Sequence, residues 1–223
     1  MAKKSKRYLE SRKVVDVAKK YELKEAVKLL KSFKRTKFDE SVEVAIKLGI
    51  DPKQSDQLIR GSVSLPKGIG KSLKVIVFAG GEKAEIAKKA GADEVGAEEL
   101  VKKVEGGWAD FDVAIATSDM MKLVGKLGRV LGPQGKMPSP KSGTVTDDIE
   151  KAVKEFKAGK IEYRTDAGGN VHALVGKISF SDSDLEDNIN TFVKLIINSR
   201  PASTKGIFLE KASVSSTMSP GIM

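Results

Sequence analysis

Cysteine and histidine are almost missing from this chain of 223 residues, which has no cysteine and one histidine. Without cysteine there is no disulfide, no thiolate nucleophile and no zinc site built on thiolates. The single histidine, His172, excludes a metal cluster or a proton relay made of several imidazoles. The sequence therefore predicts a protein that binds neither a metal nor a cofactor.

No hydrophobic run in the chain is long enough to span a membrane. The longest, VIVFA, covers only residues 75–79, whereas a membrane helix needs about 20 apolar residues. The first residues, MAKKSKRYLE, are basic but lead into no apolar stretch, so they are unlike a signal peptide. We therefore expect a cytoplasmic protein without a membrane partner.

Positive charge is in excess, and the excess is concentrated toward the N-terminus. Lys and Arg number 40 against 30 Asp and Glu, a net charge of +10. Residues 1–67 hold 18 basic and 9 acidic side chains, residues 68–159 hold 15 and 14, and residues 160–223 hold 7 of each. Such a local excess is typical of a protein that binds RNA or DNA, although it also fits a surface that only keeps the protein soluble.

The middle of the chain alternates between strands and helices. Short strands are predicted at 73–79, 92–96 and 111–119, and helices at 82–92, 97–107 and 120–132. A fourth helix is predicted to begin at the capping pair Asp147 and Glu150 and to end at Gly159. This alternation is typical of a parallel sheet with helices on both faces. Residues 68–159 are therefore predicted to form a three-layer α/β domain.

The two ends of the chain follow a different pattern. A helix is predicted at 23–33, and apolar residues alternate with polar ones at 42–48, as in a strand with one exposed face. Further strands are predicted at 161–164, 171–180 and 207–215, with a helix that begins at Ser183 and Glu186 and ends before Pro201. Because neither end has enough elements for a core, we predict one discontinuous α+β domain from residues 1–67 and 160–223.

The stretch GRVLGPQGKMPSPKSG, residues 128–143, combines glycines with basic side chains, as phosphate-binding loops do. It is not a nucleotide-binding P-loop, because Val130 stands where that motif requires a glycine. LPKGIGKS at 65–72 fails in the same way, with Leu65 at that position. The two adjacent glycines at 80–81 lack the third glycine of a dinucleotide-binding fingerprint. The sequence therefore predicts no nucleotide site and no enzyme.

Several long motifs resemble the L-one family of large-subunit ribosomal proteins, bacterial type. The signature is GKLGRVLGPQGKMPSPKSGTV at 125–145. The similarity extends to KFDESVEVAIKLGIDPKQSDQLIRGSVSLPKGIGK at 37–71, GGEKAEIAKKAGADEVG at 80–96, GWADFDVAIATSDMM at 107–121, KAGKIEYRTDAGGNVHALVGK at 157–177 and KGIFLEKASVSSTM at 205–218. It covers nearly the whole chain.

The resemblance implies two domains, the first built from both chain ends and the second a Rossmann-like insertion without nucleotide. It also implies a function and several partners. Members of this family bind large-subunit ribosomal RNA at the mobile stalk beside the tRNA exit site. We therefore expect tRNA in the exit site as a further partner, and assistance in the release of deacylated tRNA. Bacterial members also bind the messenger RNA of their own operon and repress its translation. The resemblance further implies a cytoplasmic, ribosome-bound protein that is a monomer when free and is not an enzyme.

Two segments are expected to carry most of the RNA contacts. In SFKRTKFDES (32–41), basic side chains surround Phe38, which fits either the core or contact with ribose and base faces. In SSTMS (215–219), small hydroxyls and a methionine suit a shallow RNA groove, although a frayed tail is an alternative. The primary contacts predicted with the help of the resemblance are Lys37, Phe38, Ser41, Arg164, His172, Thr217, Met218 and Ser219. The family usually has glycine at the position of Ser219.

The glycine-rich motif is expected to contribute auxiliary contacts only. Its basic residues Arg129, Lys136 and Lys141 are predicted to face RNA phosphate or to latch the domains. Lys3 and Lys4 should add little beyond sequence-independent attraction.

Two other classes of function stay open at this point. One is a DNA-binding regulator, although the sequence has no helix-turn-helix or zinc module. The other is a nucleotide-binding enzyme built on the Rossmann-like middle, which binding of ATP or NAD would reveal.

Overall fold

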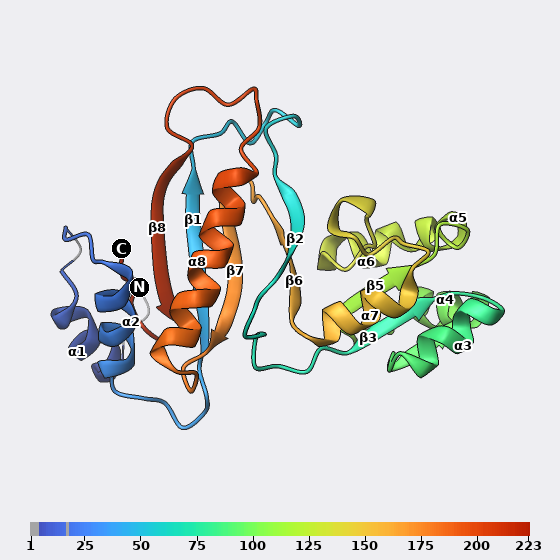
Figure 1. Ribbon diagram of the computed structural model, residues 1–223, viewed down its shortest axis with the longest axis horizontal. Coiled ribbons are helices and arrows are strands. Elements are labelled where there is room, and N and C mark those ends of the chain that lie inside the picture. Colours follow the sequence, from blue (N-terminus) through green and yellow to red (C-terminus); the bar gives the residue numbers. More distant parts are fainter. Residues whose placement is uncertain (1–4, 17) are drawn as a thin grey trace. The chain divides into compact units, whose positions relative to one another are not determined.

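The structure is a computed structural model that describes residues 5–16 and 18–223 (Figure 1). Lys3 and Lys4 lie outside the described residues. The chain divides into two compact units, Met1–Gly70 with Ile161–Met223, and Lys71–Lys160. The prediction of a mixed α/β chain is confirmed, whereas independent folding of two domains stays a prediction.

The first unit is built around a three-stranded antiparallel sheet with strand order β7-β1-β8. A separate two-stranded sheet pairs β2 with β6. The elements of this unit are α1 (Lys6–Val14), α2 (Leu23–Ser32), β1 (Ser41–Leu48), β2 (Arg60–Ser64), β6 (Lys160–Arg164), β7 (Asn170–Lys177), α8 (Asp182–Asn198) and β8 (Leu209–Ser216).

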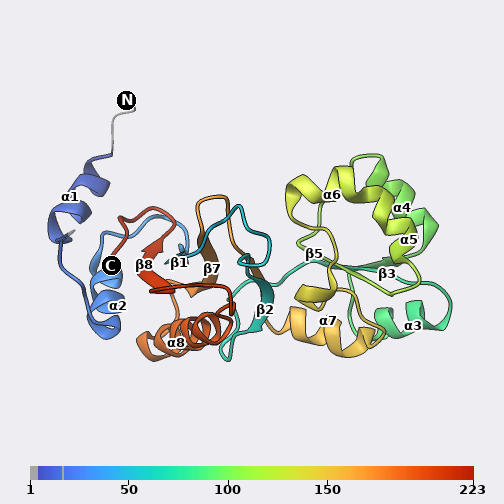
Figure 2. The ribbon, with the colours of Figure 1, turned by 90° about the horizontal axis from the view of Figure 1, so that it is seen from above.

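Both ends of the chain are needed for this sheet, because β1 lies between two strands from the C-terminal part. Every second side chain of β1, from Val42 to Leu48, is fully buried. Figure 2 shows α2 and α8 on one face of the sheet, and α8 contributes Leu185 and Phe192 to its core. Glu43 and His172 are exposed. The period-2 pattern of β1 thus gives one buried and one exposed face.

Several predicted boundaries in this unit are wrong. Helix α8 begins earlier than predicted, because Ser181 is its N-cap and accepts a hydrogen bond from Asp184 N at 3.1 Å. Strand β7 ends at Lys177, where the chain turns and Phe180 N donates to the Lys177 carbonyl at 3.1 Å. Neither α1 nor β2 was predicted.

The second unit has a parallel sheet with strand order β4-β3-β5. Its elements are β3 (Val75–Phe78), α3 (Glu82–Lys89), β4 (Glu94–Gly96), α4 (Glu98–Glu105), β5 (Val113–Ala116), α5 (Met121–Val124), the short 3-10 helix η1 (Gly125–Leu127), α6 (Gly128–Gln134), the short 3-10 helix η2 (Pro140–Ser142) and α7 (Ile149–Lys157). All four side chains of β3 are buried. Val77 packs with Phe156 of α7 on one face, and Phe78 packs with Val104 of α4 on the other. The unit therefore has three layers.

The start of α7 corrects another prediction. Its N-cap is Asp148, whose carboxylate accepts from Lys151 N at 3.2 Å, not Asp147. Asp147 instead forms an ion pair with Lys83, at 2.6 Å between Oδ1 and Nζ.

Candidate RNA-binding site

The end of the antiparallel sheet brings together residues from two distant segments. The hydroxyl of Thr217 accepts from Ser41 N at 3.0 Å, and Thr217 N donates to the Ser41 carbonyl at 3.0 Å. Strand β7 also contributes to this end of the sheet, because Lys177 Nζ donates to Ser41 Oγ at 2.8 Å. Ser41 and Thr217 are 176 residues apart in the chain and are joined only by this pairing.

The turn after β8 is closed by its own hydrogen bonds and is not a frayed tail. Ser219 N donates to the Ser216 carbonyl at 3.2 Å, and Ser216 N donates to Ser219 Oγ at 2.8 Å. Further along, Val214 and Ile222 exchange two backbone hydrogen bonds of 2.9 Å. This geometry leaves Met218, in the middle of the turn, 49% exposed.

Phe38 lies outside the core, with 54% of its surface exposed. Its carbonyl accepts from Thr36 Oγ1 at 2.9 Å, which fixes the loop before β1. Lys34, Arg35 and Lys37 beside it are also exposed. An exposed aromatic ring among cations suits a nucleic acid, because cations neutralise phosphates while the ring packs on ribose or base. We call the cluster of Lys37, Phe38, Ser41, Thr217, Met218 and Ser219 the sheet-end site.

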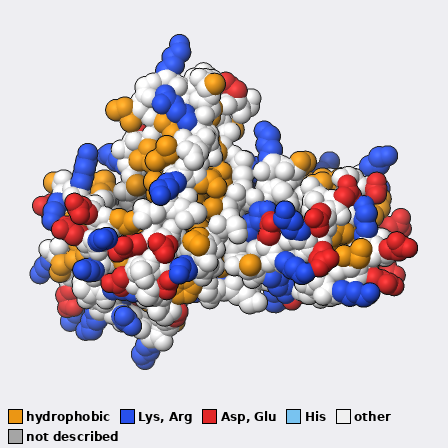
Figure 3. Space-filling model, in the orientation of Figure 1, with side chains coloured by type: hydrophobic (Ala, Val, Ile, Leu, Met, Phe, Trp, Pro, Cys, Tyr) orange, Lys and Arg blue, Asp and Glu red, His pale blue; other side chains and the backbone are white. Residues whose placement is uncertain are grey.

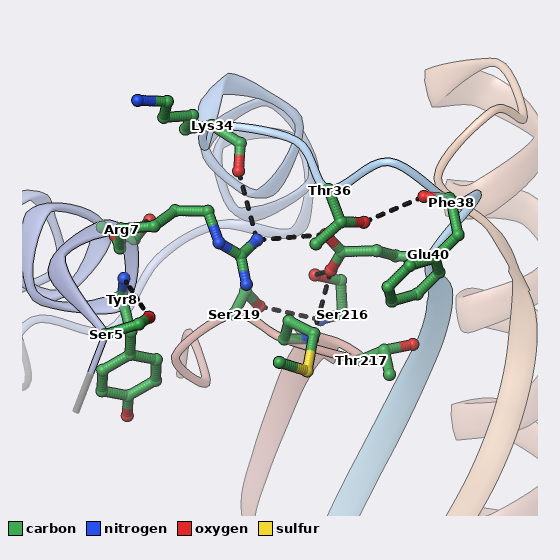
Figure 4. Close-up of polar contacts among 12 residues, drawn as sticks. Ser5, Arg7, Tyr8, Lys34, Thr36, Phe38, Glu40, Ser216, Thr217 and Ser219 are labelled. Carbon is green, nitrogen blue, oxygen red and sulfur yellow. Dashed lines mark hydrogen bonds and ion pairs between the residues drawn. The ribbon is translucent and has the colours of Figure 1, made fainter. Parts of the chain in front are cut away.

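A buried carboxylate holds the sheet-end site together. Glu40 is only 5% exposed and accepts from the Ser216 hydroxyl and from Met218 N, the latter at 3.1 Å (Figure 4). Its other oxygen lies 3.4 Å from Arg7 of α1. Burial by itself would raise the pKa of Glu40, but hydrogen bonds from Ser216, Thr36 and Met218 hold the pKa below its ordinary value. Glu40 is therefore ionised at neutral pH.

Sequence reasoning missed both Glu40 and Arg7, yet one signal was present. Glu40 lies two residues before Val42, so it continues the alternation of buried residues at Val42 and Val44 one step toward the N-terminus. An acidic side chain in a buried position needs partners, so it indicates a network of donors.

Two predicted contacts lie elsewhere in the first unit. His172 is exposed on β7 opposite Ala45, with Nε2 3.5 Å from Asp166 Oδ2. Lys177 is five residue steps farther along the strand, a span of about 16 Å. Arg164 is exposed at the end of β6, in the other sheet. Within residues 5–16 and 18–223, no hydrogen bond or ion pair joins either side chain to the sheet-end site.

The predicted auxiliary contacts divide into two kinds. Arg129 and Lys141 are exposed. Lys136 is engaged within its own unit, because its Nζ donates to the Ala109 carbonyl at 2.8 Å and lies 5.0 Å from the centre of the Phe111 ring. Basic and acidic side chains are interspersed on the face of this unit seen in Figure 3. The second unit therefore presents scattered cations.

Other kinds of site find no support among the described residues. In residues 5–16 and 18–223, no three His, Asp or Glu side chains lie close enough to hold a metal ion. No helix in these ranges is long and apolar enough to cross a membrane.

Comparison with known proteins shows the family. The model of the ribosomal protein L1p/L10e family matches residues 30–220. The chain is also 54% identical to the large ribosomal subunit protein uL1 of Kosmotoga olearia, over 222 residues that cover 100% of this chain and 96% of that protein.

The chain therefore belongs to the ribosomal protein L1p/L10e family. This membership makes it a protein of the cytoplasmic ribosome and not an enzyme, as the sequence motifs predicted.

Proposed function

We propose that this protein is a constituent of the large ribosomal subunit and binds ribosomal RNA at the mobile stalk beside the tRNA exit site. The 54% identical relative is a large-subunit protein, which supports the location. The observation that carries the RNA contact is the Glu40 network. It fixes the turn after β8, on which Thr217 and Met218 are exposed, at the same end of the sheet as the exposed Phe38.

The chemistry of the sheet-end site suits RNA in two ways. Ser41 and Thr217 place hydroxyls at the end of the sheet, where they can meet ribose 2′-hydroxyls. Lys34, Arg35 and Lys37 supply positive charge in the exposed loop that leads to Phe38. In this proposal Arg129 and Lys141 add outer phosphate contacts, whereas Arg164 and His172 act at most as neighbours of the bound RNA.

Two further roles follow from the resemblance of the sequence motifs. The protein assists release of deacylated tRNA from the exit site, and it represses translation by binding messenger RNA of its own operon. Both RNAs that the protein binds directly, ribosomal and messenger, occupy the same sheet-end site, and the free protein is a monomer.

The proposal is tested by equilibrium titration of the full chain against a large-subunit ribosomal RNA fragment that carries the stalk. A random duplex of the same length is the control. We expect tight binding to the fragment only, with a slope of log affinity against log salt of about −3 if four phosphates are neutralised. Equal affinity for both RNAs, or a flat salt response, contradicts the proposal.

Repression is tested separately in a translation extract that expresses a reporter behind the leader of the operon. Added protein should lower reporter synthesis, and the variant Thr217→Val should lower it less. Equal repression of an unrelated leader would show that the effect is unspecific.

A further inference from the structure

A hollow of about 410 Å³ lies beside the sheet-end site, between the start of α1 and the turn after β8. Its lining comes from two short segments far apart in the chain, Ser5, Arg7 and Tyr8 on one side and Thr217, Met218 and Ser219 on the other. In Figure 4 the ring of Tyr8 and the side chain of Thr217 lie on the same side of the ion pair between Arg7 and Glu40. We call this feature the Tyr8 hollow.

The walls of the hollow suit a flat, partly apolar group. Tyr8 contributes an aromatic ring, and Met218 contributes an exposed thioether that adapts to the faces of planar rings. The hydroxyl of Thr217 stands at the rim. A hollow with one ring, one thioether and a polar rim can take a nucleobase, because every base has a face that stacks on an aromatic side chain.

The position of α1, and with it Tyr8, is fixed by the same carboxylate that holds the turn. Arg7 donates from one nitrogen to Glu40 at 3.4 Å and to the Lys34 carbonyl at 3.3 Å. Ser5 caps the helix by accepting from Tyr8 N at 3.3 Å. A helix of nine residues is marginal in isolation, so these contacts help to hold Tyr8 in the hollow that Met218 also lines.

Continuity with the sheet-end site and nearby positive charge indicate what occupies the hollow. The hollow shares Thr217, Met218 and Ser219 with the sheet-end site, so RNA held there reaches the hollow without a gap. Lys34 and Arg35 stand exposed nearby on the loop that approaches Arg7. Bases inside a duplex are stacked and paired, whereas proteins that stack RNA bases on aromatic side chains take unpaired ones.

We propose that the Tyr8 hollow binds one unpaired nucleobase of the RNA held at the sheet-end site, with the base stacked on the ring of Tyr8 against Met218. This inference rests on the proposed function. It adds a position at which the protein distinguishes an RNA with an unpaired base from a continuous duplex.

The first experiment compares variants of the full chain in titrations with the stalk fragment. Tyr8→Ala should weaken binding about tenfold, the loss of roughly one stacking contact, and Tyr8→Phe should stay within about twofold because the ring remains. Leu9→Ala is the matched control, since Leu9 is exposed on the same helix and does not line the hollow. Affinity for the random duplex should not change in any variant.

The second experiment locates the base without relying on a stable variant. Each unpaired nucleotide of the fragment is replaced in turn by an abasic one and titrated with wild type and with Tyr8→Ala. At one position the abasic replacement should weaken binding by wild type about tenfold but have little further effect on binding by Tyr8→Ala. This non-additivity is expected when the base and the Tyr8 ring form one contact.

Three results would overturn the inference. Tyr8→Ala could bind the fragment as tightly as wild type does, or Tyr8→Ala, Tyr8→Phe and Leu9→Ala could all lose the same affinity. The third is an abasic scan in which no position depends on Tyr8. If wild type itself does not prefer the fragment to the duplex, the proposed function fails. If Thr217→Val weakens binding while Tyr8→Ala does not, only the Tyr8 hollow fails.

Discussion

Replacing Glu40 by alanine should destabilise the first unit, because this buried carboxylate accepts hydrogen bonds from Ser216 and Met218 and pairs with Arg7. The Ser216 hydroxyl is buried and would lose its acceptor outright, at a cost of about 1–3 kcal/mol. Met218 N and Arg7 are partly accessible, so water replaces part of what they lose. We expect the free energy of unfolding to fall by about 2–4 kcal/mol.

Glu40→Gln should cost less, about 1–2 kcal/mol. The amide oxygen can still accept from Ser216 and Met218, but the amide nitrogen would face the Arg7 guanidinium, donor against donor. The pKa of Glu40 is lowered in the folded protein, so its contribution is present above the unfolded pKa of about 4.3. The stability difference between wild type and Glu40→Gln should therefore shrink as pH falls below about 4.

The chain offers a convenient assay, because its three tyrosines lie in the first unit and its one tryptophan, Trp108, lies in the second. Urea unfolding is followed by tyrosine absorbance and by tryptophan fluorescence. The tyrosine midpoint of Glu40→Ala should fall by about 1–2 M urea. Glu43→Ala, an exposed carboxylate on the adjoining strand, is the control and should unfold like wild type. The reasoning is refuted if Glu40→Ala and Glu43→Ala unfold at the same urea concentration.

Four other changes should have distinct results. Thr217→Val should lower RNA affinity by roughly 1–3 kcal/mol, whereas Thr217→Ser, which keeps the hydroxyl, should bind like wild type in the same titration. Ser219→Gly should lower the free energy of unfolding, measured in urea, by about 1 kcal/mol, because Ser216 N loses its acceptor. Its RNA affinity should stay within about threefold of wild type, and a large gain in affinity would show that the Ser219 side chain obstructs RNA. Backbone and side-chain hydrogen bonds from Asn170 lower the pKa of Asp166 to about 2, so the stabilisation by this carboxylate is present above about pH 4 and is lost as pH falls toward 2. The stability of Asp166→Asn should therefore depend less on pH across that range, and an unchanged pH profile would contradict this. Deleting residues 71–160 and bridging the ends with a short Gly-Ser linker should leave a folded first unit that keeps most affinity for the stalk fragment, and a loss of a hundredfold or more would move recognition to the second unit.

The structure changes how that deletion should be made. The sequence placed the insertion at 68–159, but Ile69 is 2% exposed and the Gly68 carbonyl accepts from Asn188 at 2.9 Å. Keeping the chain through Gly70 preserves both. The pairing of β2 with β6 supports bringing the two cut ends together with a short linker.

Local patterns were enough to predict most of the fold. The alternation in β1 and the fully apolar β3 both correspond to strands, because each pattern follows from how many faces of a sheet are covered. Helix α1 was missed because its sequence, KRYLESRKV, has no apolar stripe, and contacts with Glu40 and Lys34 hold it instead. Strand β2, RGSVS, is poor in strand-forming residues and depends on its partner β6.

The site was predicted as two segments but not as one network. Nothing local links Ser41 to Thr217, and only the order β7-β1-β8 brings them together. Arg164 stands apart because β6 belongs to the other sheet, and His172 stands apart because it lies farther along β7, opposite Ala45. Lys136 was assigned to phosphate by its charge alone, and its contacts with Ala109 and Phe111 depend on tertiary packing.

The central claim, that RNA is held at the sheet-end site, is tested most directly by amide hydrogen exchange of the full chain with and without the stalk fragment. We predict slower exchange in residues 36–41 and 215–221 on binding, and no change around Ile207 at the opposite end of β8. Protection confined to residues 71–160, or to the opposite end of β8, would contradict the account.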